Sequence, residues 1–246
     1  MISTTIITLN EEDKIGRTIK NLKGLADEII VVDSGSADKT VAIAESLGAK
    51  VFFREFDNFA AQKNWAVSKA KGDWVLAVDA DEEIPISLAE EIKEAVKSDR
   101  YAGYLISRKN FILGKEIKYS RWSPDTHIWL WKKDSGKWMG DVHEELVVDG
   151  KVGLLKGSKI HHSHNTVSSF MKTNNLYSTL EALSLHKQNV RFSFGRMFWA
   201  AFFEFFIRFF YKWGFLDGKE GFVLAYIMGI YKLTVWIKLW ELEQKR

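Results

Sequence analysis

Trp74-Val75-Leu76-Ala77-Val78-Asp79-Ala80-Asp81 is an apolar run that ends in two carboxylates, one residue apart. Its length and composition are typical of a strand that is buried on both faces of a parallel sheet. Ligands of open parallel sheets bind beyond the carboxyl ends of the strands. The stretch therefore predicts a fold class and, at its end, the location of a site.

Two similar runs precede this one, at 4–9 and 28–33, and the second also ends in an acid, Asp33. Helical patterns separate the runs: Ile15, Ile19 and Leu22 recur at helical spacing, and a second pattern includes Val41. A shorter strand is expected at 50–53. Alternation of strand and helix is the signature of βαβ units, so the sequence predicts an α/β fold.

Alternate carboxylates such as Asp79 and Asp81, on a short turn after a buried strand, can reach one cation from adjacent backbone positions. Without any cysteine, a metal site must use carboxylate, imidazole or water ligands, which favours Mg or Mn. An acidic tripeptide alone is common in turns. Asp33 also has an ordinary alternative, because the sequence around it suits a tight turn.

The chain changes character after residue 100. Residues 101–160 alternate apolar and polar positions and contain several glycines, which predicts mixed or antiparallel strands with long loops. A helix is expected at about 166–188. We therefore expect three parts: an α/β half at 1–100, a second half at 101–190 and a separate tail at 191–246.

The tail is rich in aromatic residues, but charged residues interrupt it, so no stretch offers eighteen uncharged apolar residues. Glu204, Arg208 and Lys212 follow one another at spacings of four, which places them on one helical face. This pattern predicts an amphipathic helix that lies in a membrane interface, with Lys232 and Lys238 snorkelling from a second helix. The alternative is a helix packed on the catalytic domain or in a dimer interface.

Charge is divided unevenly along the chain. Residues 1–100 carry 13 Lys/Arg against 19 Asp/Glu, and residues 101–246 carry 22 against 13. The basic half lacks an arginine-rich run or a nucleic-acid reading motif, so anionic lipid is the expected partner and nucleic acid is not. The N-terminal sequence lacks the pattern of a signal peptide, which predicts a cytoplasmic protein at the inner face of the cytoplasmic membrane.

Four pieces of the sequence, taken together, resemble the family 2 glycosyltransferases, whose fold is GT-A. They are residues 6–12 (Ile-Ile-Thr-Leu-Asn-Glu-Glu), residues 30–40 (Ile-Val-Val-Asp-Ser-Gly-Ser-Ala-Asp-Lys-Thr), residues 61–64 (Ala-Gln-Lys-Asn) and residues 72–82, which contain the Asp79-Ala80-Asp81 turn. The downstream run Gly140-Asp141-Val142-His143-Glu144 and the aromatic tail narrow the resemblance to enzymes that build the lipopolysaccharide core.

The resemblance implies that residues 1–100 are the donor-binding half and residues 101–190 the acceptor-binding half. It also implies a role for each matching position. The donor-binding residues that it implies are Thr8, Asn10, Glu11, Asp33, Lys63 and Asp79. Thr8 to Glu11 and Asp33 would grip the base and ribose, Asp79 would face the ribose or phosphate side, and a nearby lysine would complement the phosphate charge. Asp81 would bind the metal. Lys63 has an alternative interpretation as a solvated helix residue.

Transfer with inversion needs a base that deprotonates the acceptor hydroxyl. Glu144 and Asp125 are the candidates, because Asp134 and Asp149 lie in turn sequences where a solvated role is expected. Glu144 is preferred, since it stands in the run that resembles the second acidic site of the family. Its neighbour His143 is a candidate metal ligand, with phosphate, acceptor and structural roles as alternatives.

Two further observations concern the same half of the chain. His162 and His164 are two residues apart and share a face if they lie on a strand, so they are a minor candidate for a metal site. Similar enzymes also carry an arginine where this chain has Trp129, which raises the alternative that the indole stacks on a sugar ring.

The sequence thus predicts an inverting, metal-dependent transferase that moves a hexose or heptose from a nucleotide-linked donor, expected to be UDP-linked, to a lipid-linked saccharide such as lipopolysaccharide core. One alternative is transfer to polyprenyl phosphate or to another glycan or protein. The other is a non-catalytic module that binds membrane surfaces on a transferase scaffold.

Overall fold

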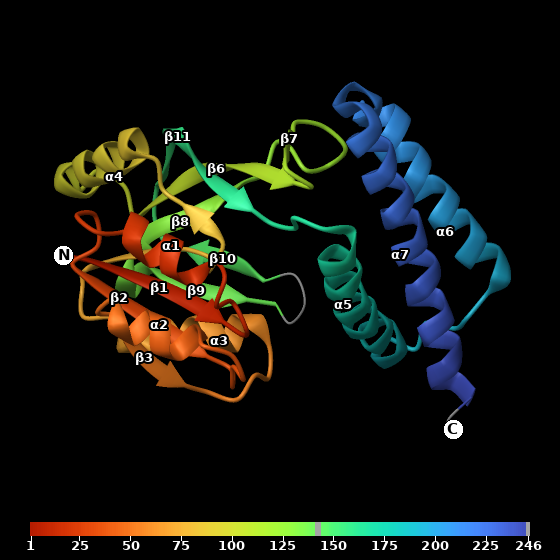
Figure 1. Cartoon of the computed structure of the whole chain (residues 1–246), viewed down its shortest axis with the longest axis horizontal. Coiled ribbons are helices and arrows are strands. Elements are labelled where there is room, and N and C mark those ends of the chain that lie inside the picture. The colour runs from red at the N-terminus through yellow and green to blue at the C-terminus, as the bar shows by residue number, and fades with distance from the viewer. Residues whose placement is uncertain (141–143, 245–246) are drawn as a thin grey trace. The chain divides into compact units, whose positions relative to one another are not determined.

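A computed structural model describes residues 1–140 and 144–244, and His143 lies outside the described residues. The chain forms two compact units (Figure 1). The first comprises residues 1–108 and 126–161, and the second comprises residues 109–125 and 162–246. The chain passes between them along two long strands, β6 (Gly103–Ile112) and β11 (Val152–His162).

The first unit begins with the predicted βαβ pattern. Its elements are β1 (Ile2–Thr8), α1 (Ile15–Asn21), β2 (Glu28–Asp33), α2 (Thr40–Ser46), β3 (Lys50–Phe53), α3 (Phe59–Lys69) and β4 (Trp74–Ala77). These strands pair in parallel in the order β3-β2-β1-β4. The helical residues Ile15, Ile19 and Leu22 are fully buried, as their spacing predicts.

The rest of the first unit extends this sheet with antiparallel partners. The elements are β5 (Glu82–Glu83), α4 (Ile86–Ser98), β6, β8 (Thr126–Lys132), the 3-10 helix η1 (Lys133–Ser135), β9 (Gly136–Met139), β10 (Glu145–Val148) and β11. The sheet continues in the order β4-β8-β6-β11-β5, and β9 and β10 form a separate hairpin. The mixed pairing predicted for residues 101–160 is therefore present.

The second unit is mainly helical. It contains β7 (Lys115–Ile117), α5 (Val167–Lys187), α6 (Phe194–Phe206), the π-helix η2 (Ile207–Tyr211), the 3-10 helix η3 (Gly214–Asp217) and α7 (Gly218–Gln244). The helix predicted at about 166–188 is α5, which begins after Thr166, whose side chain accepts a hydrogen bond from the Ser169 N–H at 3.1 Å.

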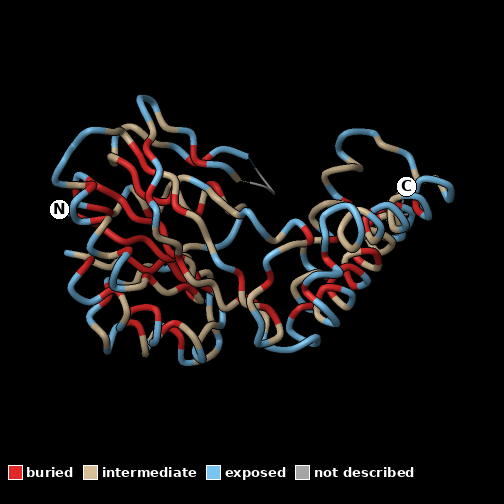
Figure 2. The backbone as a smooth tube through the Cα atoms, turned by 90° about the horizontal axis from the view of Figure 1, so that it is seen from above, coloured by how far each residue is buried: buried red, intermediate tan, exposed pale blue. Residues whose placement is uncertain are grey.

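Helix α7 is the central helix of the second unit, and it packs against both α5 and α6. The stretch Gly214–Gln244 is long and apolar enough to cross a membrane by length and composition alone, although 44% of its most apolar window is buried in the structure. Its buried positions, such as Leu224, Val235 and Leu239, form the core of this unit (Figure 2).

Four charged residues of the tail make contacts within the second unit. Lys232 pairs with Glu181 at 2.7 Å, and the Lys238 ammonium donates to oxygens of α5, so both lysines contact α5. Glu204 and Arg208 form a buried pair. Because Glu204 and Arg208 bond to each other inside the unit, this part of the charged stripe faces inward, whereas its third member, Lys212, is exposed and aromatic residues such as Phe202 and Phe206 face outward.

Candidate active site

The carboxyl ends of β1 and β2 lie side by side, since Thr8 pairs with Asp33 in the register of the sheet. The Asp33 carboxylate is buried and accepts hydrogen bonds from the backbone N–H groups of Gly35 and Ser36, at 2.9 and 2.8 Å. Gly35 has a φ of 99°, which a side chain would strain. Asp33 therefore shapes the loop that follows β2, as the turn alternative predicts.

The loop after β1 is joined to the loop after β2. Asn10 adopts a φ of 55°, its N–H donates to Ser36 Oγ at 2.8 Å, and its Oδ1 accepts from the Ala37 N–H at 2.9 Å. The Glu11 N–H donates to Thr40 Oγ1. Within the described residues the buried Thr8 hydroxyl has no hydrogen-bond partner. These contacts join the two loops into one continuous surface. At the strand end they leave the Thr8 hydroxyl without a protein partner among the described residues.

A buried network holds the Asp79 turn. The Asp79 N–H donates to Glu82 Oε2 at 2.9 Å, and the Arg108 guanidinium lies 3.3 Å from carboxylate oxygens of both Asp79 and Glu82. Lys159 Nζ lies 2.5 Å from Glu82 Oε2, and both side chains are 0% exposed. Arg108 therefore holds the Asp79 carboxylate directly, and Lys159 holds the Glu82 carboxylate that accepts the Asp79 N–H.

This charge distribution keeps the two carboxylates of the turn ionised. Burial raises the pKa of Asp79, but the charges of Lys63, Lys159, Arg108 and His161 outweigh it and lower the pKa to about 2. The pKa of Asp81 is also below its ordinary value, because a hydrogen bond and the charge of His161 oppose the effect of burial. Both groups are anionic at neutral pH.

Asp81 lies between an imidazole and an ammonium group. Its Oδ1 lies 3.3 Å from His161 Nε2, and its Oδ2 lies 3.3 Å from Lys14 Nζ. Among the described residues there is no cluster of three or more acidic or imidazole side chains arranged around one metal position. Two ionised carboxylates with a neighbouring imidazole are hard donors, and they fit a Mg or Mn ion that completes its shell with water and phosphate oxygens.

Helix α3 joins the site to the hairpin of β9 and β10. Lys63 Nζ lies 2.7 Å from Glu144 Oε1, and the ammonium also lies 4.3 Å from the centre of the Trp138 ring. The next residue, Asn64, donates to the Trp138 carbonyl at 2.9 Å and accepts from the Trp138 N–H at 3.0 Å. Lys63 is thus an ion-paired, largely buried residue, and the alternative of a solvated helix residue is wrong.

The candidate base Asp125 lies in the second unit, where its Oδ2 accepts a hydrogen bond from Asn110 at 2.9 Å. His162 and His164 belong to the same unit, and their rings pack 5.6 Å from Phe111 and 4.9 Å from Phe170, respectively. These ring contacts favour structural roles for both imidazoles.

The sequence interpretation missed two basic residues of the site, Lys159 and His161. They are two residues apart on β11, and one contacts Glu82 while the other contacts Asp81. Alternation along a strand places such residues on one face, so a search for basic residues with a period of two would have found them.

Trp129 is buried, and the Lys159 ammonium lies 3.5 Å from the centre of its ring. A buried ring in contact with an ammonium offers no open face, so a sugar does not stack on Trp129 in this structure. The missing arginine of similar enzymes is thus replaced by an indole that packs inside the first unit.

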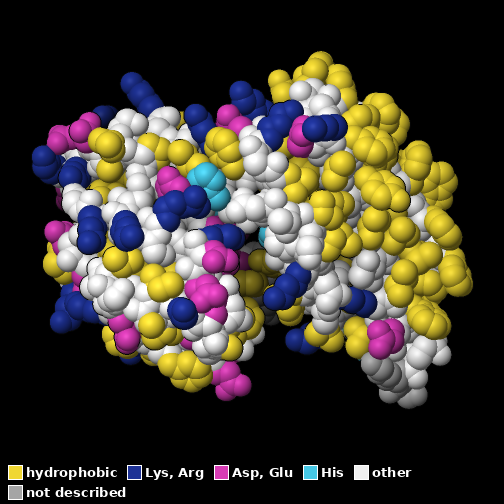
Figure 3. Space-filling view, in the orientation of Figure 1, with side chains coloured by type: hydrophobic (Ala, Val, Ile, Leu, Met, Phe, Trp, Pro, Cys, Tyr) yellow, Lys and Arg dark blue, Asp and Glu magenta, His cyan; other side chains and the backbone are white. Residues whose placement is uncertain are grey.

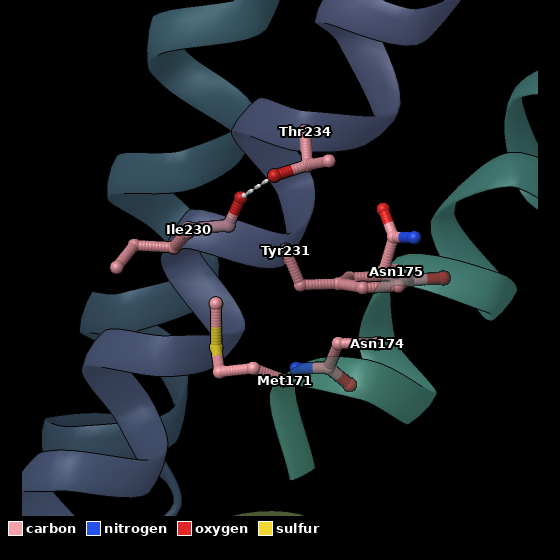
Figure 4. Close-up of a pocket in the computed structure, with 6 residues that line it drawn as sticks. All are labelled: Met171, Asn174, Asn175, Ile230, Tyr231 and Thr234. Atoms are coloured by element: carbon pink, nitrogen blue, oxygen red, sulfur yellow. Dashed lines mark hydrogen bonds between the residues drawn. The ribbon is translucent and has the colours of Figure 1, made fainter. Parts of the chain in front are cut away.

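A small pocket of about 50 Å³ lies between α5 and α7, entirely within the second unit. Figure 4 shows that its lining side chains come from these two helices. They are Met171, Asn174, Asn175, Ile230, Tyr231 and Thr234. None of the predicted site residues lines this pocket, and its volume suits water rather than a sugar nucleotide.

Similar proteins come from several bacteria. The chain is 36% identical to an uncharacterised glycosyltransferase of Rickettsia typhi, over 99% of this chain and 88% of that protein. It is 27% identical to the lipopolysaccharide core biosynthesis glycosyltransferase LpsC of Rhizobium meliloti, over 98% of this chain and 92% of that protein.

Several solved structures have a fold similar to that of this chain. Glucosyl-3-phosphoglycerate synthase from Mycobacterium tuberculosis, in complex with Mn²⁺, UDP and glucosyl-3-phosphoglycerate, matches with a TM-score of 0.50 and 19% identity, over 78% of this chain and 81% of that chain. S. aureus TarS (residues 1–349) also matches with a TM-score of 0.50, at 16% identity, over 100% of this chain and 92% of that chain. The predicted GT-A fold with an aromatic-rich C-terminal helical segment is therefore confirmed.

The family model described as "Glycosyl transferase family 2" matches residues 3–148, which include both joined loops, the Asp79 turn and Glu144. More than half of the chain thus follows the pattern of one family. We conclude that this chain belongs to glycosyltransferase family 2 and is a glycosyltransferase.

Proposed function

We propose that the protein is an inverting, divalent-cation-dependent transferase that moves a hexose or heptose from a UDP-linked donor to a lipid-linked saccharide, such as lipopolysaccharide core. The observation that carries this proposal is the site of the first unit, in which Asp79 and Asp81 are ionised and Lys63 pairs with Glu144. The likeness to LpsC supports the acceptor class, and the similar fold of glucosyl-3-phosphoglycerate synthase, whose structure contains UDP, supports the donor class.

Donor binding is assigned to the strand ends. The unpartnered Thr8 hydroxyl and the joined loops of Asn10, Glu11 and Asp33 would hold the nucleoside, and Asp79 would orient the ribose or phosphate side. Asp81 would bind a Mg or Mn ion, with the neighbouring His161 imidazole, or His143, as a further ligand. When bound, the ion neutralises charge that develops on the diphosphate leaving group.

Proton transfer is assigned to Glu144, with Asp125 as the alternative base. The acceptor hydroxyl gives its proton to the carboxylate, its oxygen forms a bond to the anomeric carbon, and the bond from that carbon to the diphosphate breaks. Attack opposite the leaving group inverts the anomeric centre. The Lys63 ammonium, now paired with Glu144, would turn to the diphosphate, and this would leave the carboxylate free to accept a proton.

The metal assignment is tested by titrating UDP in the presence and absence of Mn²⁺. The Asp81→Asn variant should lose the Mn²⁺-dependent part of UDP binding, because the ion loses its anionic ligand. Asp73→Asn, at an exposed carboxylate before β4, is the matched control and should bind as the parent protein does. Equal Mn²⁺ dependence in both variants would contradict the metal site, and no Mn²⁺ dependence in the parent would favour a non-catalytic module.

The base assignment is tested with the Glu144→Gln variant. It should retain Mn²⁺-dependent UDP binding and lose transfer by a factor of about 10² or more, as expected for removal of a general base. Glu145→Gln changes the exposed neighbouring carboxylate and should keep activity. Full activity of Glu144→Gln, with loss in Asp125→Asn, would move the base to Asp125.

Membrane association belongs to the same proposal. The exposed aromatic residues of α6 and α7, which Figure 3 shows as a yellow region over these helices, support binding of the second unit to the inner face of the cytoplasmic membrane. A lipid-linked acceptor lies at that surface, so such binding would bring the enzyme to its substrate.

A further inference from the structure

The exposed face of α6 and η2 is a stripe of phenylalanines spaced by four residues. Its members are Phe194, Phe198, Phe202, Phe206 and Phe210, and each is 46–69% exposed. The rings of Phe202 and Phe206 have centroids 6.0 Å apart, and those of Phe206 and Phe210 have centroids 4.9 Å apart. Contiguous apolar patches of this kind mark interaction sites on soluble proteins, so the stripe requires a partner.

At one end of this stripe the chain builds what we call the basic corner, residues 115–121 and 207–219. The two segments are adjacent within the second unit (Figure 1), and hydrogen bonds join them. Buried Asp217 accepts hydrogen bonds from the N–H groups of Lys118 and Tyr119, at 3.1 and 3.0 Å, and the Ser120 N–H donates to the Lys212 carbonyl at 2.9 Å. The corner is therefore one packed structure and not two independent loops.

The corner contains unfavourable backbone conformations. Ser120, Arg121 and Trp213 have φ values of 62°, 65° and 59°, which residues other than glycine adopt at a cost. The π-helical turn η2 enters the corner, and such turns are frequent at functional sites. Strained conformations persist where surrounding contacts hold them, and they cluster at sites with a function.

The exposed side chains of the corner are mainly cationic or apolar. The two segments contain six Lys/Arg and two Asp/Glu, and Asp217 is buried among backbone donors. Glu116 lies 3.9 Å from Lys118 Nζ, and Glu220, just beyond the corner, pairs with Lys115 and Lys219. Arg121 also lies 3.2 Å from Glu204. The exposed cations are Lys115, Lys118, Arg121, Lys212 and Lys219, and the exposed apolar side chains are Phe210, Tyr211, Trp213, Phe215 and Leu216.

We propose that the basic corner docks on an anionic phospholipid surface, with Trp213 and Phe215 entering the boundary between headgroups and acyl chains. Lys118, Lys212 and Lys219 then pair with headgroup phosphates, and the phenylalanine stripe continues the apolar contact. Aromatic rings at headgroup level beside cations are typical of such interfaces. A second copy of the same corner would bring cations against cations, so charge favours lipid over a symmetric dimer.

This inference rests on the proposed membrane association and adds the lipid class and the docking residues. The test is flotation with vesicles of phosphatidylcholine, with and without phosphatidylglycerol. The full-length protein should bind the anionic vesicles, and added salt should weaken that binding. W213A/F215A should reduce the bound fraction about tenfold or more, because two interfacial rings are lost. W213F should retain binding.

Charge and surface controls complete the design. K118Q/K212Q/K219Q should bind both kinds of vesicle equally and without salt dependence. I86A/L154A removes two exposed apolar side chains from the first unit and should bind as the parent protein does. If W213A/F215A binds vesicles as well as the parent protein does, the docking role of the basic corner is wrong, but membrane association stands. If the parent protein binds no vesicle, the proposed membrane association is wrong as well. Dimers in vesicle-free solution that W213A/F215A abolishes would assign the surface to a second copy.

Discussion

At the scale of single residues, the least expected feature is a lysine without solvent exposure. Lys159 contacts only buried groups in the described structure, among them the Glu82 carboxylate and the Trp129 ring. Burying an ion pair is seldom favourable in itself, and removal of one partner leaves the other charge uncompensated. We therefore explain the Lys159–Glu82 pair by its position, since it holds the Asp79 turn in place, and not by a contribution to the stability of the fold.

This explanation gives a prediction for two variants. Lys159→Met should lower the free energy of unfolding by about 3 kcal/mol, because Glu82 keeps a buried charge with one cation fewer. The double variant Glu82→Gln/Lys159→Met should recover most of that loss. Urea unfolding followed by circular dichroism measures both changes.

The control is Lys97→Met, which removes the ammonium of an exposed ion pair with Glu94 on α4. Exposed pairs contribute little, so this change should lower stability by less than about 1 kcal/mol. Equal stability of the Lys97 and Lys159 variants would show that the buried ammonium has no electrostatic role.

At the scale of secondary-structure elements, α3 organises the site. Three consecutive residues of this helix bond to four different segments: Gln62 to the loop after β2 and to the Arg54 carbonyl, Lys63 to Glu144, and Asn64 to β9. The Asn64 amide pairs with both backbone groups of Trp138, as a neighbouring strand would. The helix thereby positions the hairpin of β9 and β10, whose second strand begins directly after Glu144.

Replacing Asn64 tests this role. In Asn64→Ala the N–H and C=O groups of buried Trp138 lose their partners, at a cost of about 1–3 kcal/mol for each group. We expect faster hydrogen exchange at the Trp138 amide and a lower kcat, because Glu144 is held less firmly. Ser68→Ala, on the same helix, is the control, since its hydroxyl bonds to the Trp65 carbonyl of α3 itself.

The outcome of the Asn64 experiment separates two interpretations. Lower kcat with unchanged KM for the donor would indicate a positioning role for the hairpin. Unchanged hydrogen exchange and unchanged kcat would mean that packing of Trp138 alone holds β9 in place.

At the scale of the whole molecule, function and surface are divided between two compact units. The first unit carries the ionised turn and Lys63–Glu144, and the second carries the aromatic surface and the basic corner. In the second unit, Glu204 of α6 and Arg208 of η2 are largely buried, while most phenylalanines of the same two elements are exposed, which is the reverse of the usual amphipathic pattern. Such an inversion is unfavourable in water and favourable at a lipid boundary, which is the environment that we propose.

Ligand binding should therefore change the stability of the protein. UDP with Mn²⁺ at about 100 times its Kd should stabilise the folded state by about 2.7 kcal/mol, since only the folded site binds it. Thermal unfolding with UDP, with Mn²⁺ and with both measures this effect. Chelation by EDTA should remove the stabilisation, and the Asp81→Asn variant should show none of it.

The sequence by itself determined the parallel strands, the carboxylates at their ends and the family, because these depend on local apolar runs and on fixed spacing. Tertiary structure alone decided which side chains meet. Lys63 and Glu144 are 81 residues apart, and the pairing of His161 with Asp81 and of Lys159 with Glu82 depends on how β11 joins the sheet. Likewise, spacing placed Glu204 and Arg208 on one helical face, but only their packing determined that this face is buried.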